Sequence, residues 1–280
     1  MADHLFAVGS FTESYAGFRA VGEGLSLVRL RSDGGLDIVD RLDSLPNPSF
    51  LKPIAGNRLL ASIEVDDSRN GIATIVIDAG RLCLQHHQPT VGRVLCHVDV
   101  DPTGRWLAGA CYGSGHVFAG PLCAGGPFRD VLSTVRRSGH SVHPIRQTVS
   151  HPHAVRFSPD GRWIVVPDLG TDEVACYPFA EGRLDTARVN VWHAPAGSGP
   201  RLARFSRDGR HLVLVHELTS EVSSLRFDDG VMEPVARISS LRTPFPGENT
   251  AAGLHLAPHL ECLRRFQSRR PDHRLLPFRR

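Results

Sequence analysis

Short apolar runs separated by polar turns recur along most of this chain. The clearest example is the run Trp163–Val166, which follows the turn Pro159–Gly161 and precedes a second polar turn that ends at Asp172. An Asp-Gly pair between apolar runs is typical of a β-hairpin, because glycine adopts positive φ without steric strain from a Cβ atom. No convincing stretch has the 3.6-residue periodicity of an amphipathic helix. The pattern therefore predicts an all-β fold.

The hairpin belongs to an internal repeat. The turn glycines of three aligned segments are 57 and 48 residues apart (161 − 104 and 209 − 161). A period of about 40–55 residues that contains four short strands is typical of a β-propeller blade, whereas a doubly wound α/β fold would alternate strands with helices. The aligned segments are His97–Leu107, His153–Ile164 and Leu202–Leu212.

Counting such units predicts an incomplete propeller of about five blades plus part of a sixth. The sixth unit begins at Asn249–Pro258, where the next expected element is an Asp-Gly turn. Instead the composition changes abruptly, and residues 259–280 are rich in arginine. We therefore expect a propeller domain over residues 1–258 and an aberrant basic tail over residues 259–280.

Composition excludes several classes of protein. The formal net charge of +3 comes largely from the tail, so a nucleic-acid partner is not indicated. The six cysteines are dispersed without a Cys-x-x-Cys pair, which argues against a zinc ribbon or a redox dithiol. The first ten residues have neither a basic segment nor a long apolar run. We therefore expect a cytoplasmic protein with no membrane partner.

Several motifs are close to those of a known family. They are Val8–Thr12, Asn47–Leu51, His151-Pro-His-Ala-Val-Arg-Phe-Ser-Pro-Asp-Gly-Arg162, Val166-Pro-Asp-Leu-Gly-Thr-Asp172, Gly199-Pro-Arg201, Glu217-Leu-Thr-Ser-Glu-Val222 and Asn249-Thr-Ala-Ala-Gly-Leu-His255. With these motifs the chain resembles the lactonase family of seven-bladed β-propellers, of the 6-phosphogluconolactonase and 3-carboxy-cis,cis-muconate cyclase type. The resemblance covers residues 5–258. It implies a seven-bladed fold, here incomplete, a small anionic lactone as the partner, and no cofactor.

Some positions depart from the family pattern. Cys111 stands where the family usually has Asn, and Gly253 replaces an acidic residue. Reading the codons of Phe266–Arg270 one base later permits Ser-Asn-Arg-Gly, which resembles the family's next motif. We therefore interpret the tail as a frameshifted reading of that motif, with an unrelated, solvated basic tail as the alternative.

Three ionisable residues are the candidate catalytic groups. Opening or closing a lactone requires a group that moves a proton and a positive charge beside the carbonyl oxygen. His153, Arg201 and Glu217 lie at, or just after, the start of strands in successive blades, so we expect them to face the central channel. The resemblance to the muconate-cyclase branch places its proposed catalytic His, Arg and Glu on these positions. In a hydrolase, His153 or Glu217 would activate water and Arg201 would bind the anion.

Three further histidines, His97, His151 and His255, are candidate substrate-binding residues. The alternative for His97 is a structural role, since a histidine before a propeller strand often forms hydrogen bonds between blades. A metal site is not expected, because the close pairs His151–His153 and His86–His87 lack an evident third ligand.

Other conspicuous residues have structural interpretations. Asp160, Asp168, Asp172 and Asp208 fit turn residues that bind their own backbone better than catalytic acids. Trp106 and Trp163 follow turn glycines and fit a core between sheets.

Three functions fit these observations. The first is hydrolysis of an anionic sugar lactone such as 6-phosphogluconolactone. The second is a carboxymuconate lactonising cycloisomerase, which would use similar residues. The third is an inactive, truncated propeller. The sequence does not indicate the oligomeric state.

Overall fold

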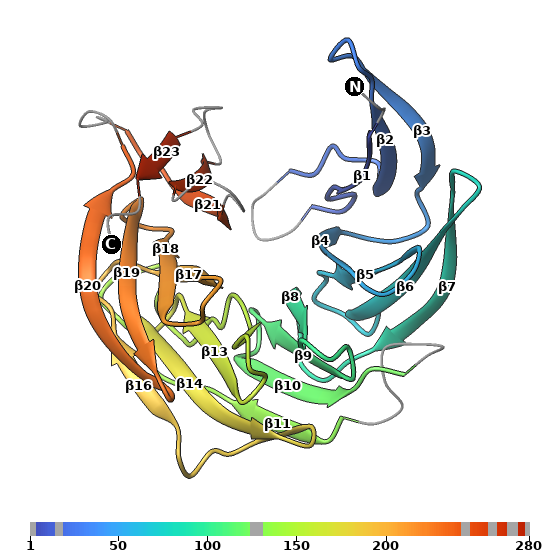
Figure 1. The fold of residues 1–280 in the computed structure, drawn as a ribbon. Coiled ribbons are helices and arrows are strands. Elements are labelled where there is room, and N and C mark those ends of the chain that lie inside the picture. Colours follow the sequence, from blue (N-terminus) through green and yellow to red (C-terminus); the bar gives the residue numbers. More distant parts are fainter. Residues whose placement is uncertain are drawn as a thin grey trace.

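Six β-sheets surround a common axis in the described part of the chain. The computed structural model describes residues 4–14, 19–123, 131–241 and 247–256, together with the backbone of residues 262–267 and 274–277. Figure 1 shows the sheets following one another around the axis in sequence order. The first sheet and the last sheet lie on either side of an opening in this ring.

Each sheet is an antiparallel meander. The first contains β1 (His4–Gly9), β2 (Leu25–Leu30) and β3 (Leu36–Leu42). The second contains β4 (Pro48–Pro53), β5 (Arg58–Ile63), β6 (Gly71–Asp78) and β7 (Arg81–Pro89), and the third contains β8 (Leu95–Val100), β9 (Trp106–Cys111), β10 (His116–Pro121) and β11 (Ser133–Arg136).

The remaining sheets repeat this order. The fourth contains β12 (Arg156–Phe157), β13 (Trp163–Asp168), β14 (Glu173–Ala180), β15 (Arg183–Leu184) and β16 (Asn190–His193), of which β15 and β16 both pair with β14. The fifth contains β17 (Pro200–Phe205), β18 (His211–His216), β19 (Glu221–Asp228) and β20 (Val231–Ser239). The sixth contains β21 (Ala251–Leu256), β22 (Cys262–Gln267) and β23 (Arg274–Pro277).

The predicted all-β propeller architecture is confirmed. Every regular element of the described residues is a strand, and the middle four sheets have the strand content expected of blades. The expected domain boundary at residue 258 lies outside the described residues. Within the expected tail, the backbone of β22 pairs with β21 and the backbone of β23 pairs with β22. The frameshift interpretation stays a prediction.

Strands in the middle of a sheet are buried on both faces, and this explains their continuous apolar runs. In β5, Leu59, Ala61 and Ile63 pack toward the first sheet, whereas Leu60 packs toward the third. Successive side chains of a strand point to opposite faces, so one run contributes to two cores. Neighbouring sheets are therefore held together face to face by apolar contacts around the ring.

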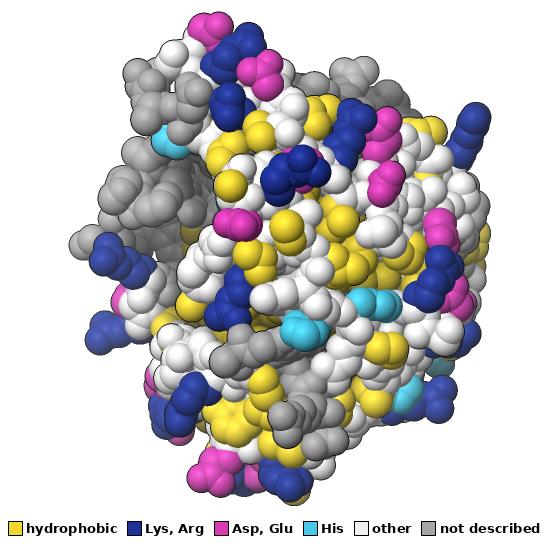
Figure 2. Space-filling model, turned by 90° about the vertical axis from the view of Figure 1, so that its right-hand side faces the viewer, with side chains coloured by type: hydrophobic (Ala, Val, Ile, Leu, Met, Phe, Trp, Pro, Cys, Tyr) yellow, Lys and Arg dark blue, Asp and Glu magenta, His cyan; other side chains and the backbone are white. Residues whose placement is uncertain are grey.

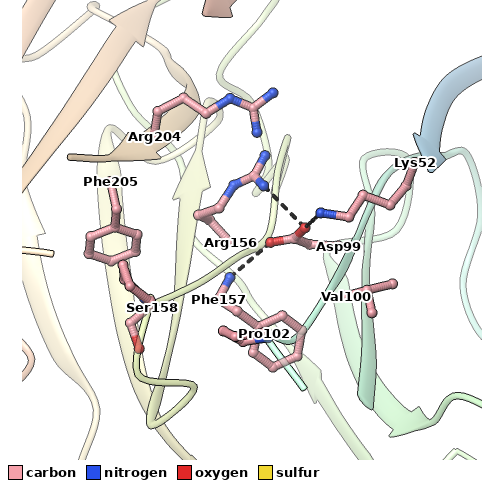
Figure 3. Close-up of a pocket in the computed structure, with 10 residues that line it drawn as sticks. Lys52, Asp99, Val100, Pro102, Arg156, Phe157, Ser158, Arg204 and Phe205 are labelled. Carbon is pink, nitrogen blue, oxygen red and sulfur yellow. Dashed lines mark hydrogen bonds and ion pairs between the residues drawn. The ribbon is translucent and has the colours of Figure 1, made fainter. Parts of the chain in front are cut away.

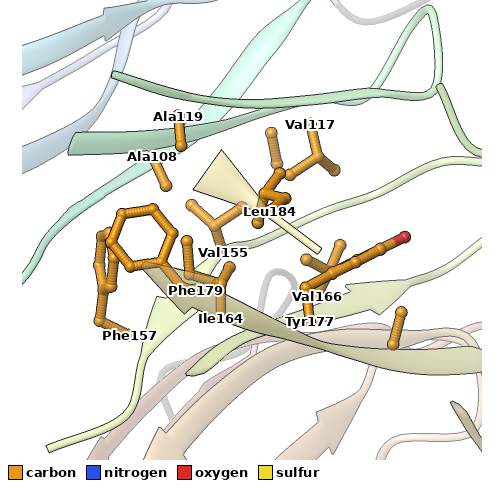
Figure 4. Packing of buried hydrophobic residues seen from close by; sticks show 12 residues of the cluster. Ala108, Val117, Ala119, Val155, Phe157, Ile164, Val166, Tyr177, Phe179 and Leu184 are labelled. Atoms are coloured by element: carbon orange, nitrogen blue, oxygen red, sulfur yellow. The ribbon is translucent and has the colours of Figure 1, made fainter. Parts of the chain in front are cut away.

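The core between the third and fourth sheets illustrates how these faces fit. Small residues of the third sheet, such as Ala108 and Ala119, meet large residues of the fourth, such as Ile164, Tyr177 and Phe179 (Figure 4). Alternating small and large side chains across a contact lets two twisted sheets approach without voids.

The predicted core role of the two tryptophans is confirmed. Trp163 packs against the hairpin of the next sheet, where the position of a Cβ on Gly230 would lie 2.4 Å from its ring. Trp106 makes the same contact with Gly182, one sheet earlier. Both glycines also have positive φ. The backbone conformation and the close approach of the tryptophan ring therefore each require glycine at these positions.

The outer strands form a mixed surface. Figure 2 shows hydrophobic side chains interspersed with charged ones on the right-hand side of the molecule in Figure 1. Exposed apolar residues of outer strands include Leu36 and Ile38 of β3 and Leu84 of β7. In the described part of the chain, no helix is long and apolar enough to cross a membrane.

The contact between Trp163 and Gly230 can be tested by Gly230→Ala. We expect this substitution to lower the free energy of unfolding by about 2–4 kcal/mol, because it adds a steric clash to the cost of a positive φ. Gly104→Ala is the matched control: Gly104 has a φ of 70°, but a Cβ there would meet no atom within 4 Å. We expect it to cost about 1 kcal/mol. Urea unfolding of both variants measures the difference, and equal losses would contradict the packing role.

Candidate functional site

A recurring β-bulge shapes the innermost strand of the second to sixth sheets near the axis. The pairing register shifts by one residue between Pro200 and Leu202 in β17, and it shifts at the equivalent place in β4, β8 and β21. In the fourth sheet the bridge Pro152–Asp168 and the pair Arg156–Val165 also differ by one residue in register. A bulge re-aims a side chain, and bulges are frequent beside active sites. The residues at this level are Ser49, Cys96, His153, Arg201 and Ala252.

A second row of residues lies beside the bulges. The second strand of a sheet pairs with the innermost strand and ends opposite the residue that precedes the bulge. In the second sheet, for example, β5 ends at Ile63, which pairs with Pro48. The next residue along the chain is Glu64, Tyr112, Leu169 or Glu217, depending on the sheet. The two rows therefore bring ionisable side chains from separate blades to one end of the axis.

The three predicted catalytic residues meet at the carboxylate of Glu217. Its Oε2 accepts a hydrogen bond from Nε of Arg201 at 2.8 Å and lies 3.7 Å from Nε2 of His153. Its Oε1 accepts a hydrogen bond from Nη2 of Arg146 at 2.7 Å. The side chain of Glu217 is 10% exposed, so these contacts are shielded from bulk water. Two arginines around one carboxylate leave this cluster with a net positive charge.

His153 is held in its neutral form. Burial lowers the pKa of His153 well below its ordinary value, and the charges of Arg201 and Arg146 lower it further. Its side chain remains 12% exposed, and its Nδ1 has no hydrogen-bond partner among the described residues. An imidazole that is unprotonated at neutral pH can accept a proton.

Tyr112 connects His151 to this cluster. The rings of Tyr112 and His151 stack with centroids 4.2 Å apart, and Tyr112 also meets His153 edge-on at 5.3 Å. Nδ1 of His151 lies 2.8 Å from the carbonyl oxygen of Tyr112, and the Tyr112 hydroxyl accepts a hydrogen bond from Arg146 at 3.4 Å. His151 therefore lies beside the predicted catalytic residues, as a substrate-binding residue requires.

The acidic residues of the motif after His153 position the backbone around the site. Asp168 accepts hydrogen bonds from the amide of His151 at 2.7 Å and the amide of Gly170 at 3.1 Å, and it pairs with buried Arg137 at 2.9 Å. Asp172 accepts hydrogen bonds from the amide of Gly199 at 2.7 Å. The bond to Gly170 agrees with the predicted turn role of Asp168, whereas Asp172 binds the amide of a loop 27 residues away and not its own turn.

Glu64 faces the same cluster. It is half-buried, and burial raises its pKa to about 7 against the opposing effects of the Ser49 hydroxyl and the charge of Arg201. The net charge of the site therefore changes near neutral pH, because Glu64 releases its proton there.

The two other predicted substrate-binding histidines are placed differently from His151, although burial lowers the pKa of His97 and the charge of Arg201 still acts on it to lower it further. His97 is fully buried; its ring packs on Phe50 at 3.9 Å, and its Nδ1 accepts a hydrogen bond from the amide of Val155 at 3.4 Å. This geometry fits a structural role for His97, the alternative to substrate binding, since the hydrogen bond joins two blades. His255 is exposed on β21, three residues beyond the bulge, at a different level from His153. Neither residue is part of the site proposed below.

Sequence reasoning missed three members of the cluster: Glu64, Tyr112 and Arg146. Tyr112 and Glu64 each follow the second strand of a blade, as Glu217 does, so an alignment of strand ends would have found them. Arg146 lies in the irregular segment between β11 and β12, and it reaches Glu217 across 71 positions of sequence. No repeat or motif marks it. Among the described residues, no group of three or more His, Cys, Asp and Glu side chains could hold a metal ion.

Comparisons with known proteins agree with this architecture. A family model described as "Lactonase, 7-bladed beta-propeller" matches residues 6–270. The 6-phosphogluconolactonase of Bacillus subtilis (strain 168) is 33% identical over 142 residues, which cover 50% of this chain and 40% of that protein. The chain spans about half the length of the curated relatives it matches, with shares of 40%, 52% and 56% for the first three.

Solved structures share the fold. The periplasmic gluconolactonase of Pseudomonas aeruginosa is 28% identical and superposes with a TM-score of 0.83 over 95% of this chain and 76% of that chain. A protein from Lactobacillus plantarum superposes with a TM-score of 0.84 at 24% identity, covering 98% of this chain and 82% of that one.

The raised pKa of Glu64 makes stability depend on pH. Between the ordinary carboxyl pKa of 4.5 and about 7, the unfolded chain releases this proton before the folded chain does. The stability contributed by Glu64 therefore falls as pH rises through that window. We expect Glu64→Gln, which stays neutral, to gain about 2 kcal/mol relative to wild type between pH 5 and pH 8.

Urea unfolding at the two pH values measures this effect. Glu23→Gln is the control, because the Glu23 side chain is 61% exposed and pairs with Arg41 at the surface. A pH dependence that is the same in wild type and Glu64→Gln would show that Glu64 ionises normally.

Proposed function

This chain belongs to the seven-bladed β-propeller lactonase family, and from that premise we propose that it hydrolyses an anionic sugar lactone such as 6-phosphogluconolactone. The observation that carries the proposal is the contact of Arg201, Arg146 and His153 with one buried carboxylate, Glu217. The Bacillus subtilis and Pseudomonas aeruginosa relatives, a 6-phosphogluconolactonase and a gluconolactonase, support a sugar lactone as the substrate.

The charge of the cluster fits an anionic substrate. Arg201 and Arg146 contribute two positive charges, and Glu217 contributes one negative charge. Glu64 is partly protonated near neutral pH, so it neutralises the remaining charge only in part. Guanidinium groups bind carboxylate and phosphate oxygens in a bidentate manner and stay charged. The site therefore attracts an anion while Glu217 fixes the orientation of both arginines.

His153 is the general base in this proposal. Neutral Nε2 takes a proton from a water molecule as the water oxygen bonds to the lactone carbonyl carbon. The acyl carbon–oxygen bond of the ring then breaks, and the protonated His153 returns the proton to the departing ring oxygen. The products are a hydroxyl group and a carboxylic acid on one open chain, so one water molecule is consumed and no other reactant is required.

Arg201 stabilises the charge that develops on the carbonyl oxygen. Positive groups fixed in advance in a shielded site are effective here, because they need not reorganise during the reaction. Nε of Arg201 is occupied by Glu217, and Nη1 donates to the carbonyl oxygen of Ala252 at 3.3 Å. These two hydrogen bonds hold the guanidinium group in place. Arg146 and Tyr112 bind the other polar groups of the substrate, and His151 lines the same end of the channel.

Two finer expectations belong to the same proposal. A sugar lactone as substrate would place the protein in carbohydrate metabolism. We keep the cytoplasmic location as a proposal, while noting that the Pseudomonas aeruginosa relative is described as periplasmic.

The proposal is tested by lactone hydrolysis with purified wild type and two variants. We expect His153→Gln to lower kcat by about 10²–10⁴-fold, because the general base is lost. We expect Arg201→Ala to lower kcat/KM by about 10²–10³-fold, because the developing negative charge loses its partner. Proton release in weakly buffered 6-phosphogluconolactone, corrected for spontaneous hydrolysis, is the measurement.

Arg188→Gln is the matched control for charge, because Arg188 is 75% exposed and pairs with Asp185 away from the cluster. It should retain wild-type activity. The same variants assayed with carboxymuconate test the cycloisomerase alternative. Folded wild-type protein that turns over neither substrate would overturn the proposal.

A further inference from the structure

A second group of charged residues lies deeper along the axis. Counting three residues from each bulge leads to the same level in the second to sixth sheets. A strand rises about 3.3 Å per residue, so this level is about 10 Å from His153 and Arg201. The residues at this level are Lys52, Asp99, Arg156, Arg204 and His255.

Four of these residues line a cavity of about 210 Å³. Figure 3 shows Lys52 and Arg156 extending from two different sheets to Asp99, with Arg204 of a third sheet lying beyond Arg156. Pro102, Phe157, Ser158 and Phe205 form other parts of the wall, near the turns that precede the second strand of each blade. His255 is not among the lining residues.

The cavity is positively charged. Lys52, Arg156 and Arg204 contribute three positive charges, and the only acidic residue in the lining, Asp99, contributes one negative charge. Asp99 is already engaged: Oδ1 binds Nζ of Lys52 at 2.7 Å and Nη1 of Arg156 at 3.1 Å, and Oδ2 accepts the amide of Phe157 at 3.0 Å. The lining therefore retains a net charge of +2.

Two guanidinium groups have donors to spare. Nε of Arg204 donates to the carbonyl oxygen of Leu254 at 3.2 Å, and no ion pair with Arg204 occurs among the described residues. Nε of Arg156 is buried without a hydrogen-bond partner in the same part of the chain. A buried donor without a partner is costly, so most native sites satisfy it with a ligand or water.

We propose that this cavity is an oxyanion site that binds a phosphate group. Three cations that converge from three sheets surround a tetrahedral anion better than a planar carboxylate, which a single arginine satisfies. The volume accommodates a phosphate or a small phosphomonoester but is below the usual range of sites for larger ligands. This proposal does not depend on lactone hydrolysis, because none of its residues belongs to the cluster around Glu217.

Lys52 provides a direct probe, because it is the only lysine of the sequence. Its side chain is 27% exposed and can therefore be reached by a small reagent. Reductive methylation with ¹³C-formaldehyde labels its amino group while keeping the positive charge. Titration of the labelled protein with inorganic phosphate, followed by NMR, reports binding at this residue without reference to activity.

We expect a saturable shift of the Lys52 methyl signal, with a Kd in the millimolar range or tighter. Arg204→Gln should weaken phosphate binding by about tenfold or more, because it removes one charged contact. Arg204 takes part in no ion pair of the described residues, so this variant leaves the Asp99 contacts intact. Arg188→Gln, which removes a distant charge, should bind phosphate as wild type does.

Phosphomonoesters, inorganic phosphate and chloride at matched ionic strength form the arms of the experiment. Tighter binding of a phosphomonoester would identify the ligand as a phosphorylated metabolite, and equal binding would identify free phosphate. A shift that chloride reproduces, or one that Arg204→Gln leaves unchanged, would overturn the proposal. If Arg204→Gln loses phosphate binding but keeps lactonase activity, the phosphate site and the Glu217 cluster act independently.

Discussion

Face-to-face packing of neighbouring sheets is the interaction on which the rest of this structure depends. Strands such as β5 and β13 bury apolar side chains on both faces, so each middle sheet belongs to two cores. Because each sheet is twisted, such packing arranges the sheets around an axis and brings one strand of each next to it. Polar side chains on that strand then meet near the axis, although they are far apart in sequence.

The bulges convert this arrangement into a site. An extra residue in the innermost strand re-aims a side chain at the same level in the second to fifth sheets, which places Ser49, Cys96, His153 and Arg201 around one channel. The repeated bulge thus places one side chain of each of these sheets at the channel, and the chemistry of the site depends on which residue stands at each bulge.

Cations outnumber carboxylates at two levels of the channel. Around Glu217, a shielded carboxylate fixes two arginines and a neutral histidine. Removing one partner from such a cluster leaves an uncompensated charge, so its members act as a unit. Around Asp99, three cations again outnumber one carboxylate. Positive potential at both levels would concentrate anions along the axis, because low-dielectric walls focus the field.

Much of this organisation could be predicted from the sequence, because it is periodic. The repeated Asp-Gly turns indicated hairpins, the continuous apolar runs indicated doubly buried strands, and the spacing indicated blades. The same alignment placed His153 and Arg201 at corresponding points of successive blades, and the structure brings them together with Glu217. The expectation that Glu217 belongs to a further blade was wrong, because it follows β18, the strand that pairs with β17 of Arg201 in the same sheet. Local propensity and repetition were sufficient here, since both are properties of the chain in order.

Only the tertiary structure decided which side chains meet. His97 aligns approximately with His153 in the sequence, but it lies one residue beyond Cys96, the bulged residue that corresponds to His153, and it is buried against Phe50. His255 falls at the deeper level because it lies three residues beyond the bulge of β21. Arg146 reaches Glu217 from an irregular loop that carries no repeat. A one-residue change of register reverses the direction of a side chain, and a loop's path is set by distant contacts; neither is recorded in the pattern of apolar and polar residues.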